Sequence, residues 1–180
     1  MNPDAAAIPG VTWGLVDRHA DERGSFRELW RSSRLPEPFV QVNLSTSAPG
    51  VLRGLHLHRR QVDHWVVASG RAFVALVDVR PLLEGRGSRP VVESRELPAD
   101  GSVTIPPGVA HGFLALEALQ LVYLVSNEYD GSDEHGFAWD DPAVAVPWLG
   151  VRRTAHVRPV LSERDRSNPS LAELMARLRA

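Results

Sequence analysis

The chain has 180 residues, the usual size of one globular domain, and 43% of them are hydrophobic. A formal net charge of −2 argues against a surface for nucleic acid or anionic lipid, and there is no run of about 18 apolar residues to predict a membrane span. The sequence has no cysteine, which excludes disulfides and thiolate chemistry. The N-terminus lacks the basic start and apolar stretch of a signal peptide, so we expect a cytoplasmic protein.

Short apolar segments separated by Gly and Pro predict strands along most of the chain, because many are rich in Val, Phe, Trp or Tyr. In chain order, we expect strands over residues 11–16, 25–30, 39–45, 51–58, 63–68, 72–79, 91–97, 103–105, 112–116 and 119–126. Turn signals stand at Ser69-Gly70 and at Pro106-Pro107-Gly108. This close spacing favours an antiparallel sandwich or closed barrel over alternating strands and helices.

The C-terminal segment carries the one convincing helix signal. Ser170 followed by Glu173 has the spacing of a capping box. Apolar residues then recur on one helical face, at Leu171, Leu174, Met175 and Leu178. We expect a short helix that covers the barrel or a partner subunit. No domain boundary is visible, so residues 1–180 are predicted to form one domain.

His56 and His58 stand two apart on a predicted strand, so both side chains point to the same face. If that face is the barrel interior, two imidazoles are buried together, which is costly unless they find partners. One interpretation is a structural hydrogen-bond network. We favour the other interpretation, a functional pocket.

Two stretches resemble the motifs of the cupin superfamily. The first motif matches at Gly50, His56, His58, Asp63 and Gly70, with Asp63 where the motif has Glu. The second matches over residues 106–111 and ends on His111, while Ala115 replaces its closing Asn. The resemblance implies an all-β, cupin-type antiparallel barrel or jelly roll. In metal-binding cupins these positions hold a divalent ion with three imidazoles and one carboxylate, a donor set that suits Fe, Mn, Ni or Zn.

Seven segments together resemble the dTDP-4-dehydrorhamnose 3,5-epimerase family, itself a family with the cupin fold. They are residues 21–28 (DERGSFRE), 39–43 (FVQVN), 51–56 (VLRGLH), 105–113 (IPPGVAHGF), 123–129 (YLVSNEY), 139–142 (WDDP) and 161–165 (LSERD). Each string is weak alone, but their order and spacing match over about residues 10 to 166, which is most of the chain.

The resemblance implies a reaction on thymidine-diphospho-4-keto-6-deoxy sugars, in which the keto group acidifies the hydrogens on neighbouring carbons. A base removes one proton, an enolate forms, and an acid returns a proton from the opposite face. By resemblance His56 is the base, Asp165 orients its imidazole, and Tyr123 is the acid. No cofactor and no metal are expected for this chemistry.

The other matches imply substrate binding and a dimer. Arg23 and Arg53 resemble the arginines that hold the diphosphate through bidentate hydrogen bonds, and His111 resembles a histidine of the same region. The positions around thymine and sugar are Phe26, Glu28, Gln41, Asn43 and Tyr129. Because family members exchange N-terminal strands, a homodimer is expected, with some of these residues supplied by the partner. Solvation of the arginines and core packing of Phe26 are the alternatives.

The sequence departs from the family at two positions. The family has a lysine near the developing enolate oxygen, but all 20 basic residues here are arginine, and Asp63 aligns with the lysine. The family usually has Gln where His58 stands. The favoured hypothesis is an epimerase acting at C3, C5 or both with a modified oxyanion pocket. The alternatives are a metal-dependent enzyme that binds one divalent transition metal through His56, His58, Asp63 and His111, and an inactive sugar-nucleotide binder.

Overall fold

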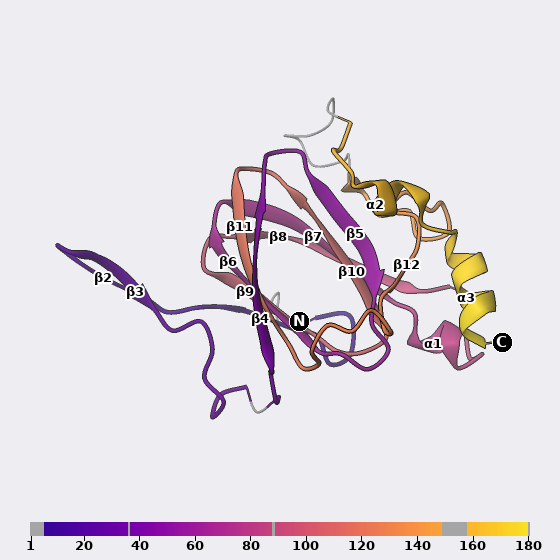
Figure 1. Cartoon of the computed structure of the whole chain (residues 1–180), viewed down its shortest axis with the longest axis horizontal. Helices are drawn as coiled ribbons and strands as arrows, with labels where there is room; N and C mark the ends of the chain where they lie inside the picture. The colour runs from indigo at the N-terminus through magenta and orange to yellow at the C-terminus, as the bar shows by residue number, and fades with distance from the viewer. Residues whose placement is uncertain (1–5, 36, 88, 149–157, 180) are drawn as a thin grey trace.

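A computed structural model describes residues 6–35, 37–87, 89–148 and 158–179, and it consists mainly of antiparallel strands (Figure 1). The strands are β1 (Thr12–Leu15), β2 (Arg18–Asp21), β3 (Gly24–Arg27), β4 (Gln41–Ser47), β5 (Leu52–Leu57), β6 (Asp63–Ser69), β7 (Arg71–Asp78), β8 (Val91–Pro98), β9 (Gly101–Ile105), β10 (Val109–Ala115), β11 (Leu119–Val125) and β12 (His135–Gly136). The helices are α1 (Arg80–Leu83), α2 (Glu163–Ser167) and α3 (Leu171–Arg179).

Two five-stranded sheets form the barrel. One has the order β1-β9-β6-β11-β4 and the other the order β12-β5-β10-β7-β8. All pairs within both sheets are antiparallel. The expected antiparallel barrel with a short C-terminal helix is confirmed. Within the described ranges, no helix is long and apolar enough to cross a membrane.

Strand β7 explains how the core is divided. Alternate residues of a strand point to opposite faces, and β7 is apolar on both. Val74 and Leu76 belong to a core cluster with residues of β6 and β9, whereas Phe73 and Val77 belong to a second cluster with residues of β5 and α3. The second cluster lies under the helices that cover the outer face of the second sheet. A strand covered on both faces reads as a continuous apolar run.

The C-terminal helix begins at the predicted cap. The Ser170 backbone N–H donates to Oε2 of Glu173 at 2.8 Å, and the Glu173 N–H donates to Oγ of Ser170 at 3.3 Å. The face predicted to be apolar is buried through Leu171, Leu174 and Met175. The apolar face therefore packs on the barrel within one chain.

The N-terminal part differs most from the prediction. The strand expected over 25–30 ends at Arg27 and pairs with β2, which was not predicted. The resulting two-stranded hairpin projects away from the barrel (Figure 1). Helices α1 and α2 were also missed, because four or five residues are too few to establish a helical period.

Candidate active site

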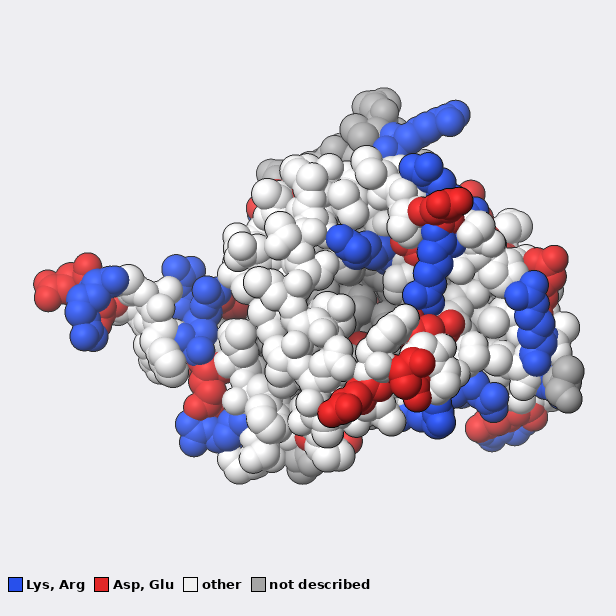
Figure 2. Space-filling view, in the orientation of Figure 1, with Lys and Arg blue, Asp and Glu red and all other residues white. Residues whose placement is uncertain are grey.

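A cavity of about 450 Å³ lies between the two sheets. One wall comes from alternating residues of β4, β6 and β11, and the other from β5 and β10. On the face seen in Figure 2, arginine side chains lie above a central hollow and acidic side chains lie below it. A concave site with apolar walls and a few convergent polar groups is the usual form of a small-molecule pocket.

A β-bulge in β5 turns two predicted site residues into this cavity. His56 lies opposite His111 and Arg53 lies opposite Phe113, so three steps along β5 match two steps along β10. Gly54 occupies the bulge with a φ of +124°, and a Cβ there would lie 2.6 Å from the Cα of Gly112. The bulge allows Arg53 and His56, which a regular strand would point to opposite faces, to line the same cavity.

His56 forms a hydrogen-bonded pair with Asp165. Nε2 of His56 lies 2.7 Å from Oδ1 of Asp165, and the Ser162 hydroxyl donates to Oδ2 at 2.8 Å. Ser162 caps helix α2, since its Oγ accepts from the Asp165 N–H. Burial opposes ionisation of the Asp165 carboxyl, but hydrogen bonds from His56 and Ser162 outweigh it and hold the pKa below its ordinary value. A carboxylate that accepts from Nε2–H leaves Nδ1 as the basic atom of His56.

Tyr123 lies on β11, in the sheet that faces His56, and it lines the same cavity. Burial raises the pKa of its hydroxyl, and the nearby Asp63 carboxylate raises it further. Tyr123 therefore keeps its proton at neutral pH. The two walls place a base candidate and an acid candidate on opposite sides of one space.

His58, Asp63 and His111 form a buried group in the same cavity. One potential ligand atom from each lies within 4.8 Å of the other two, and all three residues are buried. Burial raises the pKa of the Asp63 carboxyl, and the charge of His58 only partly offsets this. Burial, helped by repulsion from His58 and His56, lowers the pKa of His111 well below its ordinary value. His56 is not part of this group, so the four-residue set of the metal hypothesis is reduced to three.

Other predicted binding residues are brought to the cavity as expected. Gln41 and Asn43 point inward from alternate positions of β4, and Nε2 of Gln41 donates to Oδ1 of Asn43 at 2.9 Å. The Tyr129 backbone N–H donates to Oε1 of Gln41 at 2.9 Å. Nε of Arg53 donates to Oγ of Ser47 at 3.2 Å, which holds the guanidinium beside the cavity.

Three predicted binding residues lie outside the cavity of their own chain. Arg23 and Phe26 are on the projecting hairpin, and Glu28 follows directly after it. The Arg23 side chain is 85% exposed and pairs with Asp21, Phe26 is 67% exposed, and Glu28 pairs with Arg31. None of the three lines the cavity of its own chain. The interpretation of Phe26 as a core residue is wrong.

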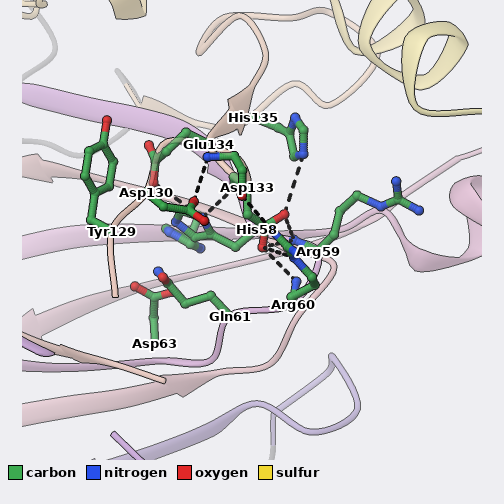
Figure 3. A network of polar contacts seen from close by, with 12 residues as sticks. His58, Arg59, Arg60, Gln61, Asp63, Tyr129, Asp130, Asp133, Glu134 and His135 are labelled. Atoms are coloured by element: carbon green, nitrogen blue, oxygen red, sulfur yellow. Dashed lines mark hydrogen bonds and ion pairs between the residues drawn. The ribbon is translucent and has the colours of Figure 1, made fainter. Parts of the chain in front are cut away.

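The segment 130–135 supplies groups that the sequence reasoning missed (Figure 3). The Asp133 carboxylate accepts from the backbone N–H groups of Arg59 and Arg60, each at 2.9 Å. This fixes Glu134 beside His58, with 3.5 Å between Oε1 and Nδ1. Glu134 also accepts from Nη1 of Arg164 at 2.8 Å, and both residues line the cavity. Arg164 was visible as the neighbour of Asp165, but nothing in the sequence placed Glu134 there.

Comparison with known proteins agrees with the fold. The family described as dTDP-4-dehydrorhamnose 3,5-epimerase matches over residues 5–173. The chain belongs to this family. A family member from Mycobacterium tuberculosis, dTDP-4-dehydrorhamnose 3,5-epimerase, is 35% identical over 94% of this chain and 87% of its own length.

Solved structures extend the family relationship to three dimensions. An epimerase from Mycobacterium tuberculosis has a TM-score of 0.84 and 32% identity, covering 98% of this chain and 92% of its own. ChmJ, a 3'-monoepimerase from Streptomyces bikiniensis in complex with dTDP-quinovose, has a TM-score of 0.81 and 30% identity, covering 96% and 89%. The cupin-type barrel is therefore shared with epimerases that differ in the carbons they invert.

Proposed function

We propose that this protein epimerises a thymidine-diphospho-4-keto-6-deoxy sugar at C3, C5 or both. The observation that carries the proposal is the pair of candidate proton-transfer groups on opposite walls of one cavity. His56 backed by Asp165 stands on one wall, and Tyr123 stands on the other. Inversion at carbon requires removal and return of a proton on opposite faces, which is what two facing groups provide.

In the proposed reaction, Nδ1 of His56 takes the proton from the carbon next to the keto group. The C–H electron pair enters the enolate, and the imidazolium is stabilised by the Asp165 carboxylate. The Tyr123 hydroxyl then donates its proton to the opposite face of the same carbon. These proton transfers use side chains of the protein and need no redox cofactor.

Deuterium uptake tests the proposal. Incubation of the protein with a thymidine-diphospho-4-keto-6-deoxy sugar in D2O is expected to place deuterium at the inverted carbon, and proton NMR identifies that carbon. His56→Ala should slow the uptake about 100-fold to 10,000-fold, the usual loss for a general base. Near-normal uptake by His56→Ala would show that the histidine is structural.

We also propose that the functional unit is a homodimer that completes each site with the partner's N-terminal hairpin. Two features of the surface support it. Strand β4 is the edge of its sheet, and Val42 and Leu44 on its outer face are 64% and 62% exposed. Arg23 and Phe26 are exposed on the hairpin, and neither lines the active-site cavity of its own chain. Light scattering at micromolar concentration should give the mass of two chains, and a stable monomer would contradict the proposal.

A further inference from the structure

The proposed reaction develops a negative charge at a point where the lysine of the family is missing from this chain. Enolate formation puts negative charge on the keto oxygen, and such charge is normally stabilised by a preorganised donor or cation. The sequence has no lysine. Arg164 is paired with Glu134, and Arg53, on the same strand as His56, donates to Ser47. Asp63, a carboxylate that would repel an enolate, is buried in the cavity wall.

Three elements converge near Asp63 and bring the buried group together. His58 follows the end of β5, Asp63 begins β6, and His111 lies on β10. Their potential ligand atoms lie within 4.8 Å of one another, and the rings of His58 and His111 are 5.3 Å apart between centroids. Atoms that each lie about 2.1 Å from a common ion cannot be much more than about 4 Å apart, so these three are close to the spacing of a first coordination shell.

The tautomers of the two histidines also fit a metal site. Nδ1 of His58 lies 2.9 Å from the carbonyl oxygen of Asp133, and Nδ1 of His111 lies 3.2 Å from that of Val109. A carbonyl oxygen can only accept, so in both rings Nδ1 carries the hydrogen. In the neutral ring, the form that a metal ligand takes, Nε2 then carries the lone pair. Histidines that bind metals are held in this way, with the second ring nitrogen donating to a carbonyl or carboxylate.

The Asp63 carboxylate is oriented but not neutralised. Nε2 of Gln61 donates to Oδ2 of Asp63 at 3.2 Å, and Figure 3 shows these two side chains next to each other. Gln61 is a neutral amide, and the described part of the chain places no arginine in an ion pair with Asp63. A carboxylate that is only 3% exposed is costly to bury without a compensating charge. A cation between Asp63 and the two imidazoles would supply that charge.

We propose that His58, Asp63 and His111 bind one divalent transition-metal ion. Two imidazoles and one carboxylate are a donor set for borderline ions such as Mn²⁺, Fe²⁺, Ni²⁺ and Zn²⁺. Three protein ligands leave at least one coordination position toward the cavity that these residues line. His56 stays outside the set because its Nε2 is bonded to Asp165, so the proposed base and the ion occupy separate places in one cavity.

The role of the ion rests on the proposed function. The keto oxygen of the substrate would take the open position, and the ion would act as a Lewis acid toward the charge that develops there. His56 would still take the proton and Tyr123 would still return one. The ion therefore replaces a cationic side chain without altering the proton balance.

Binding is tested with the ion alone. The wild-type protein, stripped with a chelator, is titrated with Zn²⁺ and with Mn²⁺ by calorimetry, and metal content is measured after dialysis. We expect about one equivalent per chain for at least one of these ions. Asp63→Asn and His58→Gln should bind that ion at least about tenfold more weakly, since even partners outside the first shell contribute that much. His135→Gln is the matched control, because His135 pairs with Asp133 nearby but is outside the group.

Thermal unfolding distinguishes lost binding from lost folding. An ion that binds the folded state raises the Tm of the wild type and of His135→Gln progressively as its concentration increases, and at the same concentration it should raise the Tm of the two ligand variants less. A wild type that takes up neither ion, or ligand variants that bind as tightly as wild type, would overturn the site.

Deuterium uptake by stripped and loaded protein separates this proposal from the proposed function. Uptake that rises at least about tenfold on loading supports the role of the ion. Full-rate uptake by stripped protein would overturn that role. A loaded protein that binds its ion but exchanges no keto-sugar proton would overturn the proposed function and leave the metal site standing.

Discussion

Asp165 accepts a hydrogen bond from His56 at 2.7 Å, although the two residues are 109 positions apart in the chain. The contact joins strand β5, which lines the cavity, to helix α2. It also leaves Nδ1 as the ring nitrogen of His56 that can act as a base. The orientation of the base is thus set by a short helix near the C-terminus.

Asp165→Asn should reduce kcat about 100-fold or more with little change in KM. The amide can occupy the same space and still accept from Ser162, but it can hold the wrong tautomer of His56 and does not stabilise imidazolium. Steady-state kinetics on the keto sugar measures the effect. Glu163→Gln in the same helix is the control and should behave as wild type, because Glu163 is exposed. A similar loss in both variants would indicate that the helix, not the dyad, is responsible.

Tyr123→Phe should separate the two proton transfers. His56 can still remove a proton, so deuterium exchange at the substrate carbon should continue from the same face. Formation of the inverted product should fall about 100-fold, because the proton from the opposite face is missing. Comparing deuterium uptake with product formation by NMR gives both rates. Equal losses in the two rates would remove Tyr123 from the role of acid.

The alkaline limb of the wild-type rate should reflect the raised pKa of Tyr123. A group whose pKa is raised keeps its proton to higher pH, so the acid stays competent above about pH 10, the ordinary value for Tyr. The rate of inverted-product formation is measured from about pH 7 to 10.5. At pH values up to about 10, loss of the Tyr123 proton should not reduce this rate. A fall centred near pH 8 that persists in Tyr123→Phe would belong to another group, and one that disappears in Tyr123→Phe would contradict the assignment.

Mixing two inactive variants tests whether Arg23 serves the partner's site. In a heterodimer of His56→Ala and Arg23→Ala chains, one site receives an intact His56 from one chain and an intact Arg23 from the other. Random exchange of chains should restore about a quarter of the wild-type sites, given a symmetric dimer. Activity after co-refolding is the measurement, with each variant alone as its control. No recovery from a confirmed heterodimer would place Arg23 outside the site.

His64 should make the folded state sensitive to acid. It lies on the opposite face of β6 from Asp63, hydrogen-bonded to Thr104, and burial lowers its pKa to about 4. Between about pH 6.5 and 4 the unfolded chain binds this proton and the folded chain does not. The free energy of unfolding therefore decreases as the pH is lowered through this range. At about pH 4.5 the loss from this residue should be about 2–3 kcal/mol relative to pH 7.

Urea unfolding of wild type and His64→Gln at these two pH values checks the effect of His64. Gln can keep a hydrogen bond to Thr104 but does not titrate, so the variant should lose less stability on acidification. His111 contributes in the same direction and is present in both proteins. The difference between the two acid losses therefore reports His64, and a difference near zero would contradict the prediction.

Residue pattern alone predicted most of the barrel, because strands alternate with period two and Gly and Pro mark their ends. Predicted strands such as 63–68 and 72–79 differ from β6 and β7 by at most one residue at either end. The capping box of α3 was equally readable, since its two residues interact within one turn. The motifs also identified His56, Tyr123 and His111, all of which line one cavity.

Tertiary structure decided what depends on contacts between distant segments. The bulge at Gly54 brings Arg53 and His56 to the same face, which strand alternation by itself denies. The hydrogen bond to Asp165 gives His56 a different role from His58, although the sequence places both histidines on the same face of one strand. Glu134 reaches His58 through a loop whose sequence carries no period. Local patterns record the alternation of a regular strand, but bulges and the partners of a buried polar group are decided by how distant segments pack.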